Sequence, residues 1–76
     1  MKEINATGAS VLNNVFACNA DTTGAAIVMS GSTGCLIDGN SANYGKTAIV
    51  NECYVDSGSA NCWGNNYQDN THALPT

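Results

Sequence analysis

A short stretch that ends in asparagine recurs three times along the chain and constrains the fold more than any other feature. Its copies occupy residues 11–14, 37–40 and 62–65, so they are spaced by 26 and 25 residues. A second phrase, apolar and partly β-branched, occupies residues 24–28, 46–50 and 71–75. A period in the low to middle twenties indicates a repeat architecture, in which each unit buries its face by stacking on the next.

The composition favours strands and turns over helices. Asparagine, serine, threonine and glycine compete with helical hydrogen bonding or have low helix propensity, whereas asparagine and glycine suit tight turns. Each apolar run spans three to six residues, which is too short for a helix and right for a strand. At 76 residues the chain allows one domain, and a monomer of this size is marginally stable without staples, a metal or a partner.

We therefore predict an all-β fold, a short β-helix-like solenoid of about three coils. Residues 1–8 form a lead-in and residues 9–76 a single repeat domain, with units at about 9–33, 34–59 and 60–76. Turns are expected to close the first two units at 30–34 and 56–59. The alternative is a small antiparallel β-sandwich or barrel, which also has short strands and Gly-rich turns but gives no reason for two phrases to recur in fixed order.

In a solenoid, side chains at matching positions stack along the axis. The apolar columns expected from the two phrases are Val11 on Ile37 on Cys62, and Ile27 on Ile49 on Leu74. The asparagines would form a structural ladder, with amides bonding along the stack: Asn14, Asn40 and Asn65. The uncapped ends of such a stack expose backbone edges that invite association.

The charge balance excludes several classes of partner. Two lysines face six acidic residues, for a net charge of -4. A basic groove for nucleic acid and binding to an anionic membrane surface are therefore not expected. No apolar run has the length of a signal peptide or a membrane span, so we expect no membrane insertion and, for a complete protein, delivery inside a larger assembly.

The four cysteines leave three possibilities open. Disulfides are possible because the number is even, and a Cys₃His zinc site with His72 is possible by count, although the spacing matches no common zinc pattern. Free buried thiols are favoured because two cysteines lie on or beside the recurring apolar phrase, where a small hydrophobe is wanted. We predict no metal and no cofactor. The cysteines are Cys18, Cys35, Cys53 and Cys62.

The string GAAIVMSGSTGCLIDGN at residues 24–40, followed by SANYGKTAIV, resembles right-handed parallel β-helix repeats. Such repeats occur in pectin-lyase-like enzymes and in bacteriophage tailspike and appendage proteins. The resemblance implies elongated, often trimeric particles with carbohydrate contact along the flank, located on a virion or an extracellular surface. About three coils stand where full members have many more, which favours a fragment, a cap or an assembled subunit.

Few residues suggest catalysis. Paired carboxylates act on sugars when held in a cleft, and Asp38 and Asp56 are the candidates, but both lie near expected turns and Asp38 belongs to an Asp-Gly turn dipeptide. A nucleophilic mechanism would need His72, which lies four residues from the end of the sequence. We predict no catalytic residue and no enzyme.

The aromatic residues are the candidates for contact with a partner or a glycan, because their ring faces stack on sugars. They equally suit a cap over an open end or an oligomer interface. The chain is therefore predicted to be a non-enzymatic structural subunit of a larger assembly, such as a virion appendage or decoration protein, and a homo-oligomer. The alternatives are a carbohydrate-binding module and a fragment of a polysaccharide depolymerase. The aromatic candidates are Trp63, Tyr67, Tyr44 and Tyr54.

Overall fold

The described part of the chain forms nine short β-strands. The structure, a computed structural model, describes residues 2–17, 25–43, 53–69 and 74–76. No helix occurs within these ranges, which confirms the all-β prediction for them. The strands are β1 (Lys2–Ile4), β2 (Ser10–Leu12), β3 (Val15–Ala17), β4 (Ile27–Thr33), β5 (Leu36–Asp38), β6 (Ser41–Asn43), β7 (Tyr54–Ser59), β8 (Cys62–Trp63) and β9 (Tyr67–Gln68).

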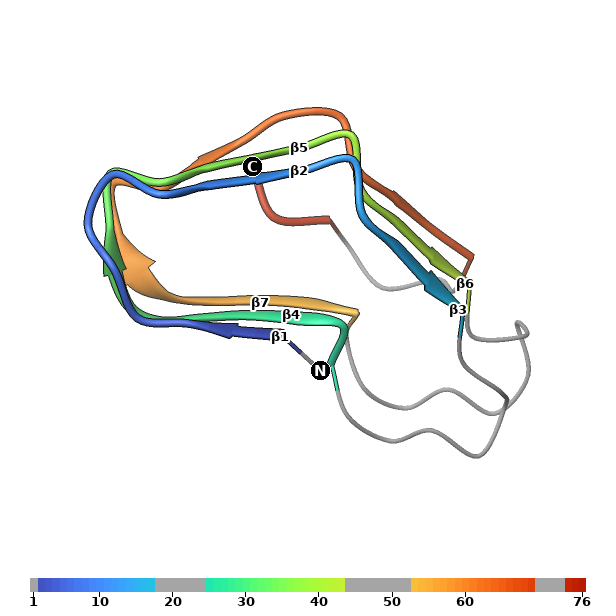
Figure 1. The fold of residues 1–76 in the computed structure, drawn as a ribbon, viewed down its shortest axis with the longest axis horizontal. Helices are drawn as coiled ribbons and strands as arrows, with labels where there is room; N and C mark the ends of the chain where they lie inside the picture. Colours follow the sequence, from blue (N-terminus) through green and yellow to red (C-terminus); the bar gives the residue numbers. More distant parts are fainter. Residues whose placement is uncertain (1, 18–24, 44–52, 70–73) are drawn as a thin grey trace.

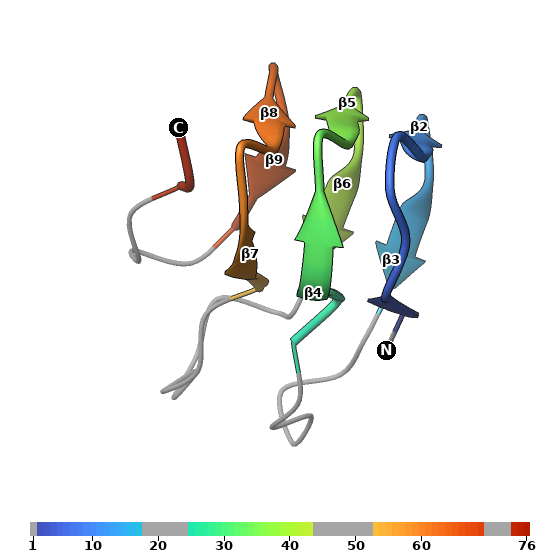
Figure 2. The same cartoon turned by 90° about the vertical axis from the view of Figure 1, so that its left-hand side faces the viewer.

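The strands form three parallel three-stranded sheets, in the orders β1-β4-β7, β2-β5-β8 and β3-β6-β9. The chain thus visits the three sheets in the same order three times, and we call β1–β3, β4–β6 and β7–β9 the first, second and third pass. Figure 1 looks along the direction in which the passes stack, and Figure 2 shows them side by side. Every pairing of the described strands is parallel and no sheet closes on itself, so the antiparallel sandwich or barrel is wrong.

The register of the second sheet confirms one predicted column and corrects its third member. Val11 pairs with Ile37, as expected, but Ile37 then pairs with Trp63. Cys62 instead pairs with Leu36 and is exposed. A shift of one residue moves a side chain to the opposite face of a strand, so the indole rather than the thiol enters the core.

The predicted column through Ile27 is also wrong. Ile27 pairs with Lys2 on one side and with Tyr54 on the other, so its neighbours are not those of the second phrase. Ile49 lies outside the described residues, and Leu74 is 41% exposed. The second phrase repeats in sequence, but it does not set the spacing of the first sheet.

Strand β4 runs through the turn expected at 30–34 and contains an irregularity. Its register with β7 shifts between Ser30 and Thr33. The buried Ser32 fills the break, because its hydroxyl donates to the Ile4 carbonyl at 2.5 Å and accepts from the Ala6 N–H at 3.4 Å. The turn expected at 56–59 is likewise strand, the second half of β7.

The corner between the first and second sheets has a left-handed backbone in all three passes. Gly8, Gly34 and Ala60 have φ values of 70°, 67° and 55°. Glycine adopts this region without penalty, whereas a Cβ crowds the following carbonyl. The third pass therefore turns the same corner with a less suitable residue.

The core lies between the three sheets and is filled by the inward-facing side chains of their strands. The inward residues of the second pass are almost fully buried, because both neighbouring passes cover them. The three C-terminal residues lie beyond the third pass, over the interior (Figures 1 and 2). The buried hydrophobic residues are Val11, Ala26, Ile27, Met29, Cys35, Ile37, Ala42, Cys53, Tyr54 and Trp63.

Candidate functional site: the asparagine ladder and the two ends

An asparagine ladder connects the three passes at the corner before the third sheet. The side-chain oxygen of Asn40 accepts from the backbone N–H and the amide nitrogen of Asn14, both at 3.0 Å. In the same way, the oxygen of Asn66 accepts from the backbone N–H of Asn40 at 3.1 Å and from its amide nitrogen at 2.9 Å. The ladder predicted at Asn14 and Asn40 is confirmed, and it has a direction, with donors in one pass and acceptors in the next.

The ladder amides also donate to the backbone of the preceding pass. Asn40 Nδ2 donates to the Val11 carbonyl and Asn66 Nδ2 to the Ile37 carbonyl, each at 3.0 Å. Asn40 is 2% exposed, so its bonds form away from water, where an unmade bond is costly. The ladder thereby fixes the register of consecutive passes.

The third member of the ladder is Asn66, not the predicted Asn65. Asn65 is exposed, and its backbone N–H donates to Asp38 Oδ1 at 2.8 Å. The prediction of Asn65 is wrong because the dipeptide Gly64-Asn65 matches Gly39-Asn40 in sequence. A constant spacing of 26 residues leads instead from Asn40 to Asn66. Constant spacing was therefore the signal that could have found it.

Trp63 belongs to the core of the third pass. It is 8% exposed, and its ring lies 5.8 Å from the Tyr54 ring with an interplanar angle of 56°, a tilted arrangement that aromatic pairs favour. Its indole nitrogen donates to Asp56 Oδ2 at 2.8 Å. The indole therefore does not offer a ring face for a ligand to stack on.

The other aromatic candidates divide between core and surface. Tyr54 is fully buried, its hydroxyl donates to the Tyr67 carbonyl at 2.6 Å, and burial, followed by the proximity of Cys53, raises its pKa to about 12. Tyr67 is 52% exposed. Tyr44 lies outside the described residues. The structure thus brings three of the four candidates together, but only one of these three presents its ring to solvent.

Asp56 is an exposed carboxylate at a register position that is apolar in the second pass. It pairs with the fully buried Met29, and its oxygens accept from Trp63 Nε1, from Gly58 N at 2.9 Å and from Asn61 Nδ2 at 3.0 Å. Desolvation is the largest single influence and raises its pKa, but the hydrogen bonds from these three donors outweigh it, so the pKa lies below 3.8. The third pass thus places an acid in register with an apolar column, and donors of the same pass supply the hydrogen bonds of its carboxylate.

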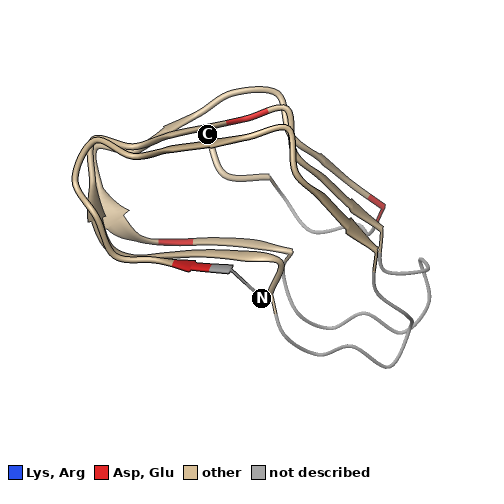
Figure 3. Ribbon diagram, viewed as in Figure 1, with Lys and Arg blue, Asp and Glu red and all other residues tan. Residues whose placement is uncertain are grey.

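The two candidate catalytic carboxylates do not form a pair. Asp38 is in β5 and Asp56 in β7, which belong to different sheets, and the acidic segments are spread around the molecule (Figure 3). Each carboxylate accepts hydrogen bonds from backbone or side-chain donors of the third pass. In the described residues both carboxylates serve as hydrogen-bond acceptors for N–H groups of the third pass.

The described cysteines differ in their surroundings. The buried thiol of Cys35 donates weakly to the carbonyls of Ala6 and Thr33, at 3.5 and 3.7 Å. This confirms the buried thiol expected at Cys35, whereas Cys62 is a thiol on the surface. Cys18 and His72 lie outside the described residues. Within the described ranges, no three histidine, cysteine or acidic side chains gather at a point where they would hold a metal.

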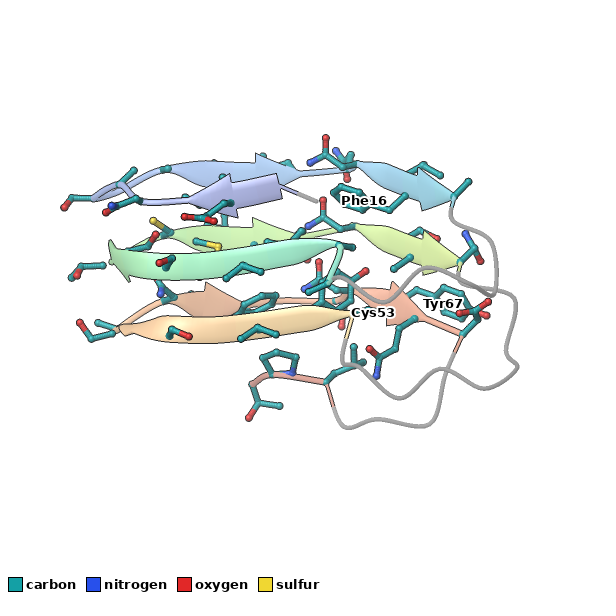
Figure 4. All side chains as sticks on the ribbon, turned by 90° about the horizontal axis from the view of Figure 1, so that it is seen from below. Phe16, Cys53 and Tyr67 are labelled. Atoms are coloured by element: carbon teal, nitrogen blue, oxygen red, sulfur yellow. The ribbon has the colours of Figure 1, made fainter. Side chains whose placement is uncertain are left out.

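The two ends of the stack are lined by different side chains. At the first-pass end three inward residues are apolar, Val11 and the partly buried Ile4 and Phe16, and Lys2 stands in register with the inward Ile27. At the third-pass end the matching residues are Trp63, Asp56 and Gln68, as the register with the second pass shows. Figure 4 shows Phe16 on the outermost layer at one end and Tyr67 in the layer at the other.

No helix in the described part of the chain is long and apolar enough to cross a membrane. The chain was also compared with known proteins. No protein-family model matches it, and neither the curated proteins nor the solved structures include a significant match.

Proposed function

We propose that this chain is a three-coil β-solenoid that serves as a non-enzymatic structural subunit of a larger assembly. The observation that carries the proposal is the set of edge strands: β1, β2 and β3 at one end and β7, β8 and β9 at the other have no further strand beside them among the described residues. Unpaired strand edges pair readily with other chains. A 76-residue chain also gains more from such contacts than a large domain, because its own core is small.

The use of the polar side chains supports a structural role. The buried asparagine and serine bind backbone groups of neighbouring passes, and both candidate carboxylates bind donors within the stack. A general acid or base must keep a free position within reach of a substrate proton. Groups engaged in this way serve better to hold register than to transfer protons.

The exposure of the aromatic rings favours the structural role over glycan binding. A sugar platform needs exposed ring faces, and of the candidates that the structure describes only Tyr67 has one, because Trp63 and Tyr54 are buried. The carbohydrate-binding module is therefore the second candidate, with Tyr67 as the residue to test. The narrower identification with a virion appendage or decoration protein, and the expectation of a trimer, rest on the resemblance to β-helix repeats.

Solution mass, measured by light scattering with and without reductant, tests the proposal. The expected result is a discrete oligomer whose mass does not change on reduction. A monomer at every concentration that loses its fold on reduction would contradict it, and would favour a disulfide-stapled binding domain. Glycan binding that is lost in Tyr67→Ala but kept in Val15→Ala, an exposed residue in the same column, would favour the second candidate.

A further inference from the structure

The backbone of the first pass directs hydrogen-bond donors out of the first-pass end. At one register position, Leu36 and Cys62 donate their N–H groups to the carbonyls of Ala9 and Cys35 in the pass before, at 2.9 and 2.7 Å. Ser10 occupies the same position in the first pass. Its N–H therefore points away from the second pass, toward a side where no described strand lies.

A second donor lies in the third sheet. Ser41 and Tyr67 donate to the carbonyls of Asn14 and Asn40, at 2.9 and 2.8 Å, and Val15 precedes them in the same column. The N–H of Val15 thus points out of the same end as that of Ser10. An occupant of this end must supply carbonyl oxygens at two positions in parallel register.

The ladder specifies a third contact. The side-chain oxygens of Asn40 and Asn66 each accept two hydrogen bonds from the asparagine of the preceding pass. Asn14 has the same side chain at the start of the ladder, and none of the described residues donates to its oxygen. An asparagine in the occupant would complete this position with its backbone N–H and its amide.

Two apolar inward residues of this end are incompletely covered. Ile4 and Phe16 pack against the core but are only partly buried, whereas Met29 and Ala42, which follow them in the same columns, are fully buried. The difference is that no described strand lies beside the first pass on this side. Covering it removes apolar surface from water, which favours docking.

A second copy of this chain does not fit as the occupant. Parallel stacking would bring its third-pass end onto the first pass, and there Asp56 would lie over the column of Ile4 and Met29, where burying a carboxylate costs several kcal/mol. Residues 74–76 lie over the same end (Figure 2). Two first-pass ends placed face to face by a two-fold axis would run antiparallel, out of register with the ladder.

We propose that the first-pass end docks a parallel β-pass of a partner chain, one with an asparagine at the ladder position and uncharged inward residues. The inference deepens the proposed structural role and rests on it: the edge strands of the first pass take a strand of a different chain, and copies of this chain associate elsewhere. The second pass itself has the required chemistry, since Asn40 stands at the ladder position and Met29, Ile37 and Ala42 are its inward residues.

A tethered probe tests the proposal. The sequence of residues 25–43 is joined ahead of the full chain through a flexible Gly-Ser linker, which raises its effective concentration at the first-pass end. Amide hydrogen exchange is then followed at Ser10 and Val15. We expect both amides to exchange at least about tenfold more slowly than in the untethered chain, because docking pairs them. The matched control carries Asn40→Leu in the tethered copy and should lose most of this protection.

Each result decides the matter. Equal exchange of Ser10 and Val15 with and without the probe overturns the proposal, as does equal protection by the Asn40→Leu control. Protection that appears in the untethered chain as its concentration rises identifies a second copy as the occupant and overturns it too. The proposed function fails differently: a wild-type monomer in light scattering contradicts the homo-oligomer but leaves the effect of the probe as expected.

Discussion

The first-pass and third-pass ends are built on the same backbone plan but finished differently. The first-pass end has two apolar inward residues that are only partly buried, Ile4 and Phe16, and a ladder asparagine whose oxygen accepts no described bond. The third-pass end has Trp63 bound to Asp56, and Tyr54 bound to the Tyr67 carbonyl. Trp63, Asp56 and Tyr54 thus find hydrogen-bond partners within their own pass, whereas the side-chain oxygen of Asn14 accepts no described bond.

This difference teaches that a repeat encodes its position in the stack through its inward polar groups. An inward charge is one of the means by which proteins keep a sheet edge from pairing. Asp56 is the charged residue of this kind at the third-pass end, because it stands in register with the apolar Met29 and Ile4. The first pass has Lys2 in register with the inward Ile27 but no acid at an inward position, and its ladder oxygen accepts no described bond, which is what makes it the receptive end.

The largest expected contrast is between the two large aromatic residues of the ends. Trp63→Ala should lower the free energy of unfolding by about 3–5 kcal/mol, since it empties a buried site and removes the donor to Asp56. Phe16→Ala should cost about 1–2 kcal/mol because the ring is only partly buried. Urea unfolding of both variants measures the difference, and equal losses would break the comparison.

The ladder should show the same gradient from its middle to its open end. Asn40→Ala should cost about 2–4 kcal/mol, because it leaves the Val11 carbonyl and the Asn14 amide without their partners in a buried site. Asn14→Ala should cost about 1 kcal/mol, since its amide is half-exposed. Asn65→Ala serves as the control in the same thermal unfolding series and should change little, because only its backbone N–H bonds to Asp38.

Asp56 should make stability depend on acid pH. Its folded pKa lies below 3.8, so the ionised form stabilises the fold at higher pH, and this contribution disappears as the pH falls from 3.8 through the folded pKa. Asp56→Asn should show a smaller loss over that interval. The check is the unfolding midpoint in denaturant between pH 6 and pH 2. Parallel pH curves for wild type and variant would show that the carboxylate contributes nothing to the third-pass end.

The smallest expected effect concerns the corner of the third pass. Ala60→Gly should raise the free energy of unfolding by about 0.5–1 kcal/mol, because Ala60 has φ 55° where the other two passes have glycine. The reciprocal change Gly34→Ala should destabilise by about 1–2 kcal/mol. Calorimetry on both variants measures the two signs, and destabilisation by Ala60→Gly would mean that the alanine methyl has a packing role at this end.

The features that could be predicted from the sequence are those that local chemistry and repetition determine. Short β-branched and apolar runs between asparagine and glycine predict strands, and the spacing of 26 residues between the first two phrases predicts both the Val11–Ile37 column and the Asn14–Asn40 bonds. These features need only the periodicity of the chain, because stacking repeats it in space.

The features that could not be predicted depend on a register that only the assembled stack defines. The choice between Asn65 and Asn66 turns on a shift of one residue, and so does the choice between Cys62 and Trp63. Aromatic residues suit a core and a binding face equally well by composition. The burial of Trp63 and Tyr54 follows from their columns, which the misaligned third phrase concealed.

The irregularity at Ser32 has a consequence for how such a chain changes over generations. Strand β4 has one residue more than β1 and β7 over the same stretch, since the register offset is 25 residues at Met29 from β1, 27 at Asp56 from β4, and 26 again at Thr33 and Ser59. A one-residue insertion or deletion ahead of the first sheet is thus absorbed before the chain reaches the second. A change of one residue in length there is expected to leave the asparagines aligned, so the first sheet is where we expect gain and loss of residues to be tolerated.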